Sequence, residues 1–414
     1  MKRFFLISVF TIICITCYAQ NVILSGVIKD KRGEVLPGAG IFVSGYKIAT
    51  VANNNGAYTL GLKPGNYDIL FQIIGYKTVA KNILVEDKAI KLDVELEEDA
   101  MQLDEVTIKP DPNRAGYIRM FTDFFIGTTP NAAQCKIINP NVLIIDYSKD
   151  DSKLTVKTNQ FLIVENKALG YRLKYQINLF EWDNKTNIIY YEGYPYYEDL
   201  KGSKGQMKRW VAKREIAYYG SSNHFLTSLY NGKSKEEGFI INKLIRQADK
   251  TRPSDSLINA KIKKFRLTAS ATAGKIQLNP ADTDSLNYWH KQKNRSKQIA
   301  ILNQKEILPD TLVKTFNESI KSINFTDVLY VIYTKEKEDP IYANRIGMSV
   351  SRPLTMPDYQ ISLVNLLVAP IYFYQNGGTY NPRSMLFEGY WSWEKIADSV
   401  PLDYLPQKKS KERL

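Results

Sequence analysis

The sequence is short of the residues that build disulfide frameworks and zinc sites. Its 414 residues include three cysteines and two histidines. A disulfide scaffold needs several cysteine pairs, and a zinc site needs a cluster of Cys, His or carboxylate ligands. His224 and His290 lie 66 residues apart, and neither belongs to an HExxH or HxxE motif. The sequence also has no Walker loop, GxGxxG motif or GxSxG elbow. We therefore expect no disulfide framework, no metal site, no cofactor and no catalytic residues.

Residues 1–20 have the composition of an export signal. Lys2 and Arg3 form a positive start, and Phe4–Cys17 is an apolar run of 14 residues. The small-x-small ending that follows suits a signal peptidase, and the apolar run is too short to span a bilayer. We predict a signal peptide cleaved after Ala19 or Gln20. The mature chain is expected to have no transmembrane helix and to be exported, to the periplasm or the outer membrane.

Residues 21–98 read as short apolar strands separated by turn signals at intervals of about 8–12 residues. The clearest turn is Asn53-Asn54-Asn55-Gly56, because Asn and Gly tolerate positive φ. Pro64-Gly65-Asn66 is another tight turn, and the long apolar strand Tyr67–Ile74 follows it. This pattern predicts a β-sandwich of seven strands.

Five motifs follow one another in this module: Ser25–Asp30, Leu36–Ala39, Gly56–Leu60, Pro64–Tyr67 and Ile74–Tyr76. Their order resembles the carboxypeptidase-like regulatory domain, a transthyretin-like or immunoglobulin-like sandwich that is common in exported envelope proteins of the Bacteroidetes. The resemblance implies export and a sandwich. It implies no peptidase chemistry, because that domain lacks a peptidase's zinc ligands. One site differs from many members, which have Thr-Asp where this chain has Ala52-Asn53; asparagine keeps the turn-forming hydrogen bond and loses the charge.

Residues 99–116 are predicted to be a linker between the sandwich and a larger body. Leu103–Ile108 is similar to a segment that follows this domain in TonB-dependent outer-membrane transporters, and such a segment can add to a partner as an edge strand. It can also be the last strand of the sandwich, ended by Pro110 and Pro112. The second alternative is favoured, because the residues that follow are too few for the membrane-spanning part of such a transporter.

Residues 117–405 alternate strand-like and helix-like patterns, so we predict a β-rich α+β chain with a mixed α+β body and a basic tail at 406–414. Tyr171–Phe180 alternates strictly between apolar and polar residues and should form a hairpin with 187–191. Helices are predicted at 117–126, 206–219 and 223–230. Strands are also predicted at 264–268, 345–350 and as a core pair within 361–374, whereas 280–323 should be helix or loop.

Positive charge is concentrated in the middle of the chain. Residues 201–266 contain 16 basic and 5 acidic residues, whereas 21–108 has a net charge of −3. A positive face can bind acidic polymers, anionic headgroups or an acidic protein, although it can also be a solvated surface. Nucleic acid is not an expected partner of an exported chain that has no nucleic-acid-binding signature.

Helix 206–219 carries the sharpest candidate site. On a helical projection, Met207, Trp210, Val211, Ala217 and Tyr218 share one face, and Arg214 falls in the middle of it. A guanidinium on an apolar stripe should either have a structural role, in which it reaches the solvent or pairs with a core carboxylate, or line a pocket. The second alternative predicts a site for an anionic or glycan ligand with these members: Arg209, Trp210, Arg214, Tyr218 and His224.

Two further aromatic or polar groups have competing interpretations. His224 follows Ser221 and Ser222 too closely for a nucleophile pair, so Ser221, Ser222 or Asn223 is predicted to cap the start of helix 223–230. Tyr390, Trp391 and Trp393 could stack on a sugar ring, or they could pack in the core.

The sequence favours a non-enzymatic envelope protein that acts as a binding or scaffold module. One alternative is a hydrolase of envelope polymers, which needs two carboxylates about 5–10 Å apart in one cleft. Another is an accessory module of a TonB-dependent outer-membrane transporter. The ligand, the partner and the oligomeric state stay open.

Overall fold

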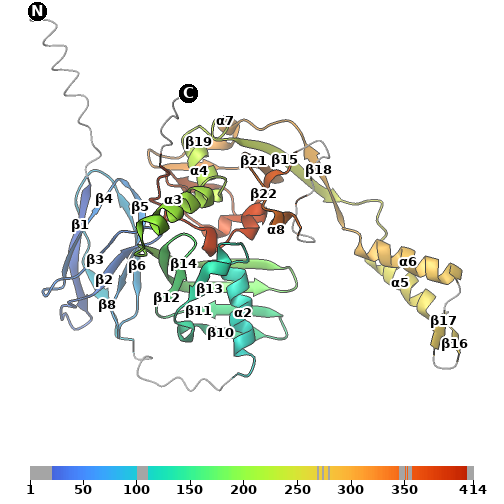
Figure 1. Cartoon of the computed structure of the whole chain (residues 1–414), viewed down its shortest axis with the longest axis horizontal. Helices are drawn as coiled ribbons and strands as arrows, with labels where there is room; N and C mark the ends of the chain where they lie inside the picture. Colours follow the sequence, from blue (N-terminus) through green and yellow to red (C-terminus); the bar gives the residue numbers. More distant parts are fainter. Residues whose placement is uncertain are drawn as a thin grey trace, which may run out of the picture.

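The computed structural model describes residues 21–99, 111–267, 270–272, 275–277, 280–344, 350, 352 and 357–407. It contains a β-sandwich, a body with two main sheets, and an arm that projects from one end of the body (Figure 1). The predicted signal peptide and the segment 103–108 lie outside the described residues. The predicted strand at 345–350 also lies outside them, apart from Val350, and so does the basic tail after residue 407.

Two four-stranded sheets form the predicted sandwich. β1 pairs with β4, β7 and β8, and the other sheet has the order β3-β2-β5-β6. Ile28, Ile41 and Phe71 are among the side chains that both sheets bury in one shared core, as facing sheets require. The strands are β1 (Val22–Asp30), β2 (Gly40–Val43), β3 (Ala49–Val51), β4 (Ala57–Leu62), β5 (Gly65–Gln72), β6 (Val79–Val85), β7 (Ile90–Lys91) and β8 (Val94–Leu96).

Residues 90–96 form two short strands, β7 and β8, which both pair with β1 in parallel. Between them, the Asp93 carboxylate accepts a hydrogen bond from the Val27 amide (N···Oδ1 2.9 Å). A side chain therefore replaces a backbone acceptor at this point of the ladder. The sandwich has eight described strands, one more than the predicted seven.

The turn at Asn53–Gly56 has the predicted chemistry. The Asn53 side-chain oxygen accepts hydrogen bonds from the amides of Asn55 (2.9 Å) and Ala57 (3.1 Å), and Gly56 has φ +70°. Asparagine at this position thus supplies the turn-forming acceptor without a carboxylate charge.

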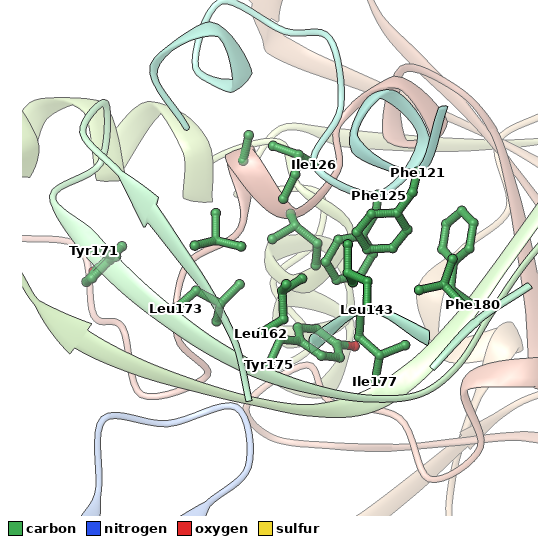
Figure 2. Packing of buried hydrophobic residues seen from close by; sticks show 14 of the residues in the cluster. Phe121, Phe125, Ile126, Leu143, Leu162, Tyr171, Leu173, Tyr175, Ile177 and Phe180 are labelled. Atoms are coloured by element: carbon green, nitrogen blue, oxygen red, sulfur yellow. The ribbon is translucent and has the colours of Figure 1, made fainter. Parts of the chain in front are cut away.

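In the body, helix α2 (Arg114–Phe125) covers one face of a six-stranded sheet. Phe121 and Phe125 point from this helix toward Phe180 and Tyr175 of β13, with ring centroids 5.0 and 5.1 Å apart (Figure 2). The predicted helix and the predicted β13–β14 hairpin are confirmed. The strands of this sheet are β9 (Cys135–Ile137), β10 (Ile144–Ser148), β11 (Lys153–Lys157), β12 (Leu162–Asn166), β13 (Tyr171–Asp183) and β14 (Ile188–Asp199).

The second main sheet has the order β18-β15-β21-β22-β24. Its central strand β21 is buried on both faces from Val328 to Tyr333. One face packs on Phe225 and Leu229 of helix α4, and the other carries Leu244 and Leu363. The strands are β15 (Phe239–Ala248), β18 (Gln298–Asn303), β21 (Val328–Lys337), β22 (Tyr359–Leu366) and β24 (Met385–Gly389).

Shorter elements complete the body. Helices α3 and α4 confirm the predictions for 206–219 and 223–230, and β19, β20 and β23 form a small separate sheet. No helix of the described ranges is long and apolar enough to cross a membrane. The elements are α3 (Lys204–Tyr218), α4 (Ser222–Tyr230), α7 (Pro309–Leu312), β19 (Val313–Thr315), β20 (Ile320–Ile323), α8 (Pro340–Ala343), β23 (Ile371–Tyr374) and α9 (Tyr390–Trp393).

The arm consists of α5 (Asp255–Leu267), β16 (Ser270–Thr272), β17 (Lys275–Gln277) and α6 (Pro280–Asn294), inserted between β15 and β18 (Figure 1). The strand predicted at 264–268 is therefore wrong as far as Leu267. Ile258 and Ile262 lie one helical turn apart and are buried where α5 packs on α6. The segment is therefore helical because its apolar side chains pack on α6, which is distant in sequence.

Two other predictions of the body need correction. Residues 280–323 were expected to be helix or loop, but β18 adds to the edge of the second sheet and β19 and β20 form a hairpin. The two strands predicted within 361–374 exist, but they do not pair with each other. β22 joins β21 and β24, whereas β23 joins β20.

The chain after α9 returns across the first sheet of the body and reaches the sandwich. Asn166 donates from Nδ2 to the Ala397 carbonyl (2.8 Å), and Thr129 donates to the Asp398 carboxylate (2.9 Å). Further on, the Leu402 amide donates to the Gly45 carbonyl of the sandwich (2.7 Å). This C-terminal segment thus connects the body with the loop between β2 and β3.

We expect Gly170→Ala to destabilise the fold more than the backbone conformation alone explains. Gly170 has φ +70°, and an added Cβ would lie 2.1 Å from Cδ2 of Trp210. Positive φ costs a side chain about 1–2 kcal/mol, and overpacking adds about 1–3 kcal/mol. Urea denaturation should show a loss of about 2–5 kcal/mol in the free energy of unfolding.

Gly232→Ala is the matched control, because Gly232 has φ +67° and nothing within 4 Å of the added Cβ. This variant should lose about 1–2 kcal/mol. Equal losses in the two variants would contradict the close packing of Trp210 on Gly170.

Candidate functional site

Arg214 is held by the protein itself. Its Nε and Nη2 donate to the carbonyls of Leu169 (2.7 Å) and Gly170 (2.9 Å), and Nη2 also pairs with Oδ1 of Asp199 (2.9 Å). The guanidinium lies 3.8 Å from the ring centroid of Tyr171. These contacts favour a structural role for the arginine, because the guanidinium is already surrounded by acceptors and an aromatic face. The partner differs from the predicted buried carboxylate, since Asp199 is 49% exposed.

The other residues of the predicted pocket are brought together only in part. Tyr218 and His224 are neighbours, with ring centroids 5.0 Å apart. Trp210 is buried, donates to the Lys167 carbonyl (2.9 Å) and lies over Gly170. Arg209, which is also on α3, is exposed. Their role in ligand binding stays a prediction.

The predicted apolar face of α3 needs one correction. Trp210, Ala217 and Tyr218 are buried as expected, but Met207 is 48% exposed. Met207 belongs to the first turn of the helix, which the capping box of Ser203 and Gln206 holds at the surface.

His224 is a buried structural residue. Ser221 caps its helix, as predicted, by accepting from the His224 amide (3.2 Å). The ring accepts from the Gly220 amide at Nδ1 (3.1 Å) and faces the Glu237 carboxylate at Nε2 (3.4 Å). Burial lowers the pKa of His224 to about 4, against the opposing effect of Glu237. The ring is therefore neutral near pH 7.

Tyr390, Trp391 and Trp393 do not form an exposed stacking surface. All three are buried, and Trp391 donates from its indole to the Gly220 carbonyl (2.6 Å). Tyr390 and Trp393 pack with Tyr342 in a small aromatic cluster. The core interpretation is therefore the correct one for Tyr390 and Trp391, whereas Trp393 also borders a cleft.

This cleft has a volume of about 880 Å³ and lies between the two main sheets of the body. One wall comes from the second sheet, with Leu244, Arg246, Leu363 and Glu388. The opposite wall comes from α2 and the start of β14, with Phe124, Ile188 and Ile189. Trp393, at the end of α9, and Lys395, just after it, border the same space. A concave, largely apolar space with a few charged groups is the usual form of a small-molecule site.

Two of the charged groups in the cleft neutralise each other. Arg246 donates from Nη1 and Nη2 to the two carboxylate oxygens of Glu388 (2.9 and 2.8 Å). Asn365 donates to the same carboxylate (2.7 Å). Burial alone would raise the pKa of Glu388, but these hydrogen bonds outweigh it and lower the pKa. Glu388 is therefore held as an ionised, oriented carboxylate.

Lys395 differs from this pair, because it forms no ion pair with a carboxylate of the described residues. Its stem passes over Gly127, where an added Cβ would lie 3.0 Å from the lysine Cβ. Burial lowers the pKa of Lys395 to about 8, and no other group of the described chain contributes to that shift. Lys395 thus borders the cleft with a half-buried side chain and forms no ion pair with a carboxylate among the described residues.

Sequence reasoning missed Arg246, Glu388 and Lys395. Arg246 and Glu388 are 142 residues apart, so no local motif connects them. The described residues contain no group of three or more His, Cys, Asp or Glu side chains that could hold a metal ion.

The N-terminal module has known relatives. Residues 24–108 match the CarboxypepD_reg-like domain family, which confirms the resemblance of the sandwich. The match includes Leu103–Ile108. The chain is also 31% identical over 94 residues to the TonB-dependent receptor SusC of Bacteroides thetaiotaomicron; this stretch is 23% of the chain and 9% of the receptor.

Solved structures are similar only at a distance. Catechol 1,2-dioxygenase of Acinetobacter radioresistens is 11% identical, with a TM-score of 0.18, and the match covers 22% of this chain and 57% of the dioxygenase. A DUF3823 family protein of Bacteroides ovatus is also 11% identical, with a TM-score of 0.17 and coverage of 45% of this chain and 83% of that protein.

Acid should destabilise the protein through His224. Its folded pKa of about 4 lies below its ordinary value of 6.5, so the unfolded chain binds the proton first as the pH falls. The stabilising contribution is complete above about pH 6.5 and is lost toward pH 4; it amounts to roughly 3 kcal/mol. Urea denaturation at a series of pH values measures this loss.

His224→Gln is the matched variant, because an amide can accept from Gly220 and donate to Glu237 without titrating. We expect its free energy of unfolding to fall less over the same pH interval. An identical fall in both proteins would show that His224 is not the group responsible.

Proposed function

We propose that the protein is an exported cell-envelope protein without catalytic activity, and that its cleft binds a ligand with an acidic group. The observation that carries this proposal is Lys395, a half-buried cation that borders the cleft and forms no ion pair with a carboxylate among the described residues. A ligand carboxylate, sulfate or phosphate would supply the missing charge. The apolar and aromatic walls, including Phe124 and Trp393, suit the carbon skeleton of a sugar or a similar ligand.

The N-terminal module supports the envelope location. Residues 24–108 match the CarboxypepD_reg-like domain family, and the chain is similar over 94 residues to a TonB-dependent receptor of a Bacteroides species, which supports the same setting. The exported state and the periplasmic or outer-membrane location remain part of this proposal.

The charges in the cleft favour binding over hydrolysis. A glycosidase needs one carboxyl group with a raised pKa to protonate the leaving group. Glu388 has a lowered pKa and is occupied by Arg246 and Asn365. Among the described residues, Asp123 is the other carboxylate that borders the cleft. A hydrolase of envelope polymers is the alternative that the experiment below must distinguish.

A second candidate function is an accessory module of a TonB-dependent transporter. The 31% identity with the receptor SusC over 94 residues favours it. In that case the sandwich would make the contact with the transporter, while the body would present the cleft.

Binding should be measured calorimetrically with uronic acid, sulfated and sialylated oligosaccharides, each beside its neutral counterpart. We expect at least one acidic probe to bind about tenfold or more tightly than its neutral counterpart, because a charge-assisted hydrogen bond contributes about 1.5–3 kcal/mol. Lys395→Gln should abolish this preference. Lys81→Gln, at an exposed site on the sandwich, is the charge-matched control and should keep it.

Two outcomes would contradict the proposal. One is that every acidic probe binds no better than its neutral counterpart. The other is that chromatography finds the probes cleaved in multiple turnovers by the unaltered protein, which would favour the hydrolase.

A further inference from the structure

The arm between Asp249 and Lys297 carries a large part of the positive charge of the chain. This stretch contains 11 basic and 4 acidic residues, so its net charge is +7, compared with +13 for all 414 residues. The arm projects from the body on the side away from the sandwich (Figure 1). The basic middle of the sequence is therefore not one surface, because α3 and α4 lie on the body and α5 lies in the arm.

The base of the arm is fixed by its own ion pairs. Arg252 donates to the Arg295 carbonyl (2.9 Å) and pairs with Asp255 (2.8 Å). Arg295 pairs with Asp249 (2.6 Å), and Lys297 pairs with Asp255 (2.5 Å). Two of the four acidic residues of the arm are thus neutralised at the base. The same ion pairs connect the start of α5 with the segment that follows α6.

The cations farther along the arm have no such partners. Within the described residues, six of them form no ion pair with a carboxylate. Lys263 and Lys264 lie on the side of α5 opposite the buried Ile258 and Ile262, so their ammonium groups point away from the arm's core. The six cations are Lys261, Lys263, Lys264 and Arg266 on α5, and Lys291 and Lys293 on α6.

Apolar side chains are exposed among these cations. Leu257 on α5 is 45% exposed and Tyr288 on α6 is 51% exposed, with Trp289 next to it (ring centroids 5.2 Å apart). A soluble polyanion would require only the cations. Cations accompanied by exposed Leu and Tyr side chains suit a membrane interface, where the rings and methyl groups enter the headgroup region and the cations contact phosphates.

We propose that this arm docks the protein on an anionic phospholipid surface. The docking surface consists of the six cations together with Leu257 and Tyr288. It is separate from the cleft, because the cleft is bordered by the two main sheets and α9 whereas the arm projects beyond β15 and β18. The protein could thus hold a ligand in the cleft while the arm rests on the membrane.

The test is co-sedimentation of the full-length mature chain with lipid vesicles. One set contains phosphatidylcholine alone, and the other contains about 30% phosphatidylglycerol. We expect binding to the anionic vesicles to exceed binding to the neutral ones about tenfold or more, and to fall in about 0.5 M salt, where charges are screened.

The variant Lys263→Gln/Lys264→Gln/Arg266→Gln should weaken this binding about 100-fold, since each cation near an anionic surface contributes a several-fold factor. The control Lys29→Gln/Lys81→Gln/Lys88→Gln removes the same charge from exposed sites of the sandwich and should bind as the unaltered protein does. Leu257→Ser/Tyr288→Ser should also weaken binding, and this loss should persist at high salt. Circular dichroism checks that each variant keeps its helices.

The proposal is overturned if the protein binds anionic vesicles no better than neutral ones, or if the sandwich control loses as much binding as the arm variant. It is also overturned if the protein binds soluble polyphosphate more tightly than the vesicles and Leu257→Ser/Tyr288→Ser has no effect. That result would mark the arm as a site for an acidic polymer.

Discussion

Asp199 connects three parts of the molecule, because its two carboxylate oxygens face different cations. Oδ1 pairs with Arg214 of α3 (2.9 Å), and Oδ2 pairs with Lys47 of the sandwich (3.0 Å). Asp199 itself ends β14 of the first body sheet. The carboxylate is half exposed, so the ion pairs alone contribute modestly. The ion pairs matter because they lie beside backbone hydrogen bonds that also join the sandwich to the body.

Those backbone bonds fix the sandwich on the body. The Gly45 amide donates to the Pro195 carbonyl (2.6 Å), the Tyr197 amide donates to the Tyr46 carbonyl (3.0 Å), and the Leu402 amide donates to the Gly45 carbonyl (2.7 Å). Phe42 adds edge contacts with Phe161 and Tyr196. Three segments far apart in sequence therefore meet at one loop of the sandwich. We call this contact between sandwich and body, made by Gly45, Tyr46, Pro195, Tyr197 and Leu402, the joint. Because backbone groups that leave water need partners, the joint favours a single orientation of the two parts.

A fixed joint gives the proposed binding surfaces defined positions. The C-terminal segment that reaches Gly45 also carries Lys395, so the cleft and the joint belong to one continuous stretch of chain. The arm lies at the far end of the body from the sandwich (Figure 1). A protein built in this way can present a sandwich, a cleft and a basic arm to different components of an envelope at the same time.

The sequence predicts best where local chemistry decides the structure. The Asn53 turn, the Ser221 cap and the alternation along β13 depend on neighbouring residues, and all three predictions are correct. The helix at 264–267 was missed, because Ile258 and Ile262 become a buried stripe only through contact with α6.

The candidate site could not be predicted for the same physical reason. Arg246 meets Glu388 across 142 residues, and Lys395 packs over Gly127, which precedes it by 268 positions. Helical periodicity did single out Arg214, but it could not decide between a carboxylate partner and a pocket. The decision depended on Asp199 and the Gly170 carbonyl, which belong to other elements.

The most direct measurement of whether sandwich and body form one unit is native-state hydrogen exchange at the joint. The amides of Gly45, Tyr197 and Leu402 should exchange as slowly as those in the centre of β13, since all would open only with the fold as a whole. Rapid exchange at these three amides, while β5 and β13 stay protected, would show that the sandwich moves independently of the body and would contradict the fixed joint.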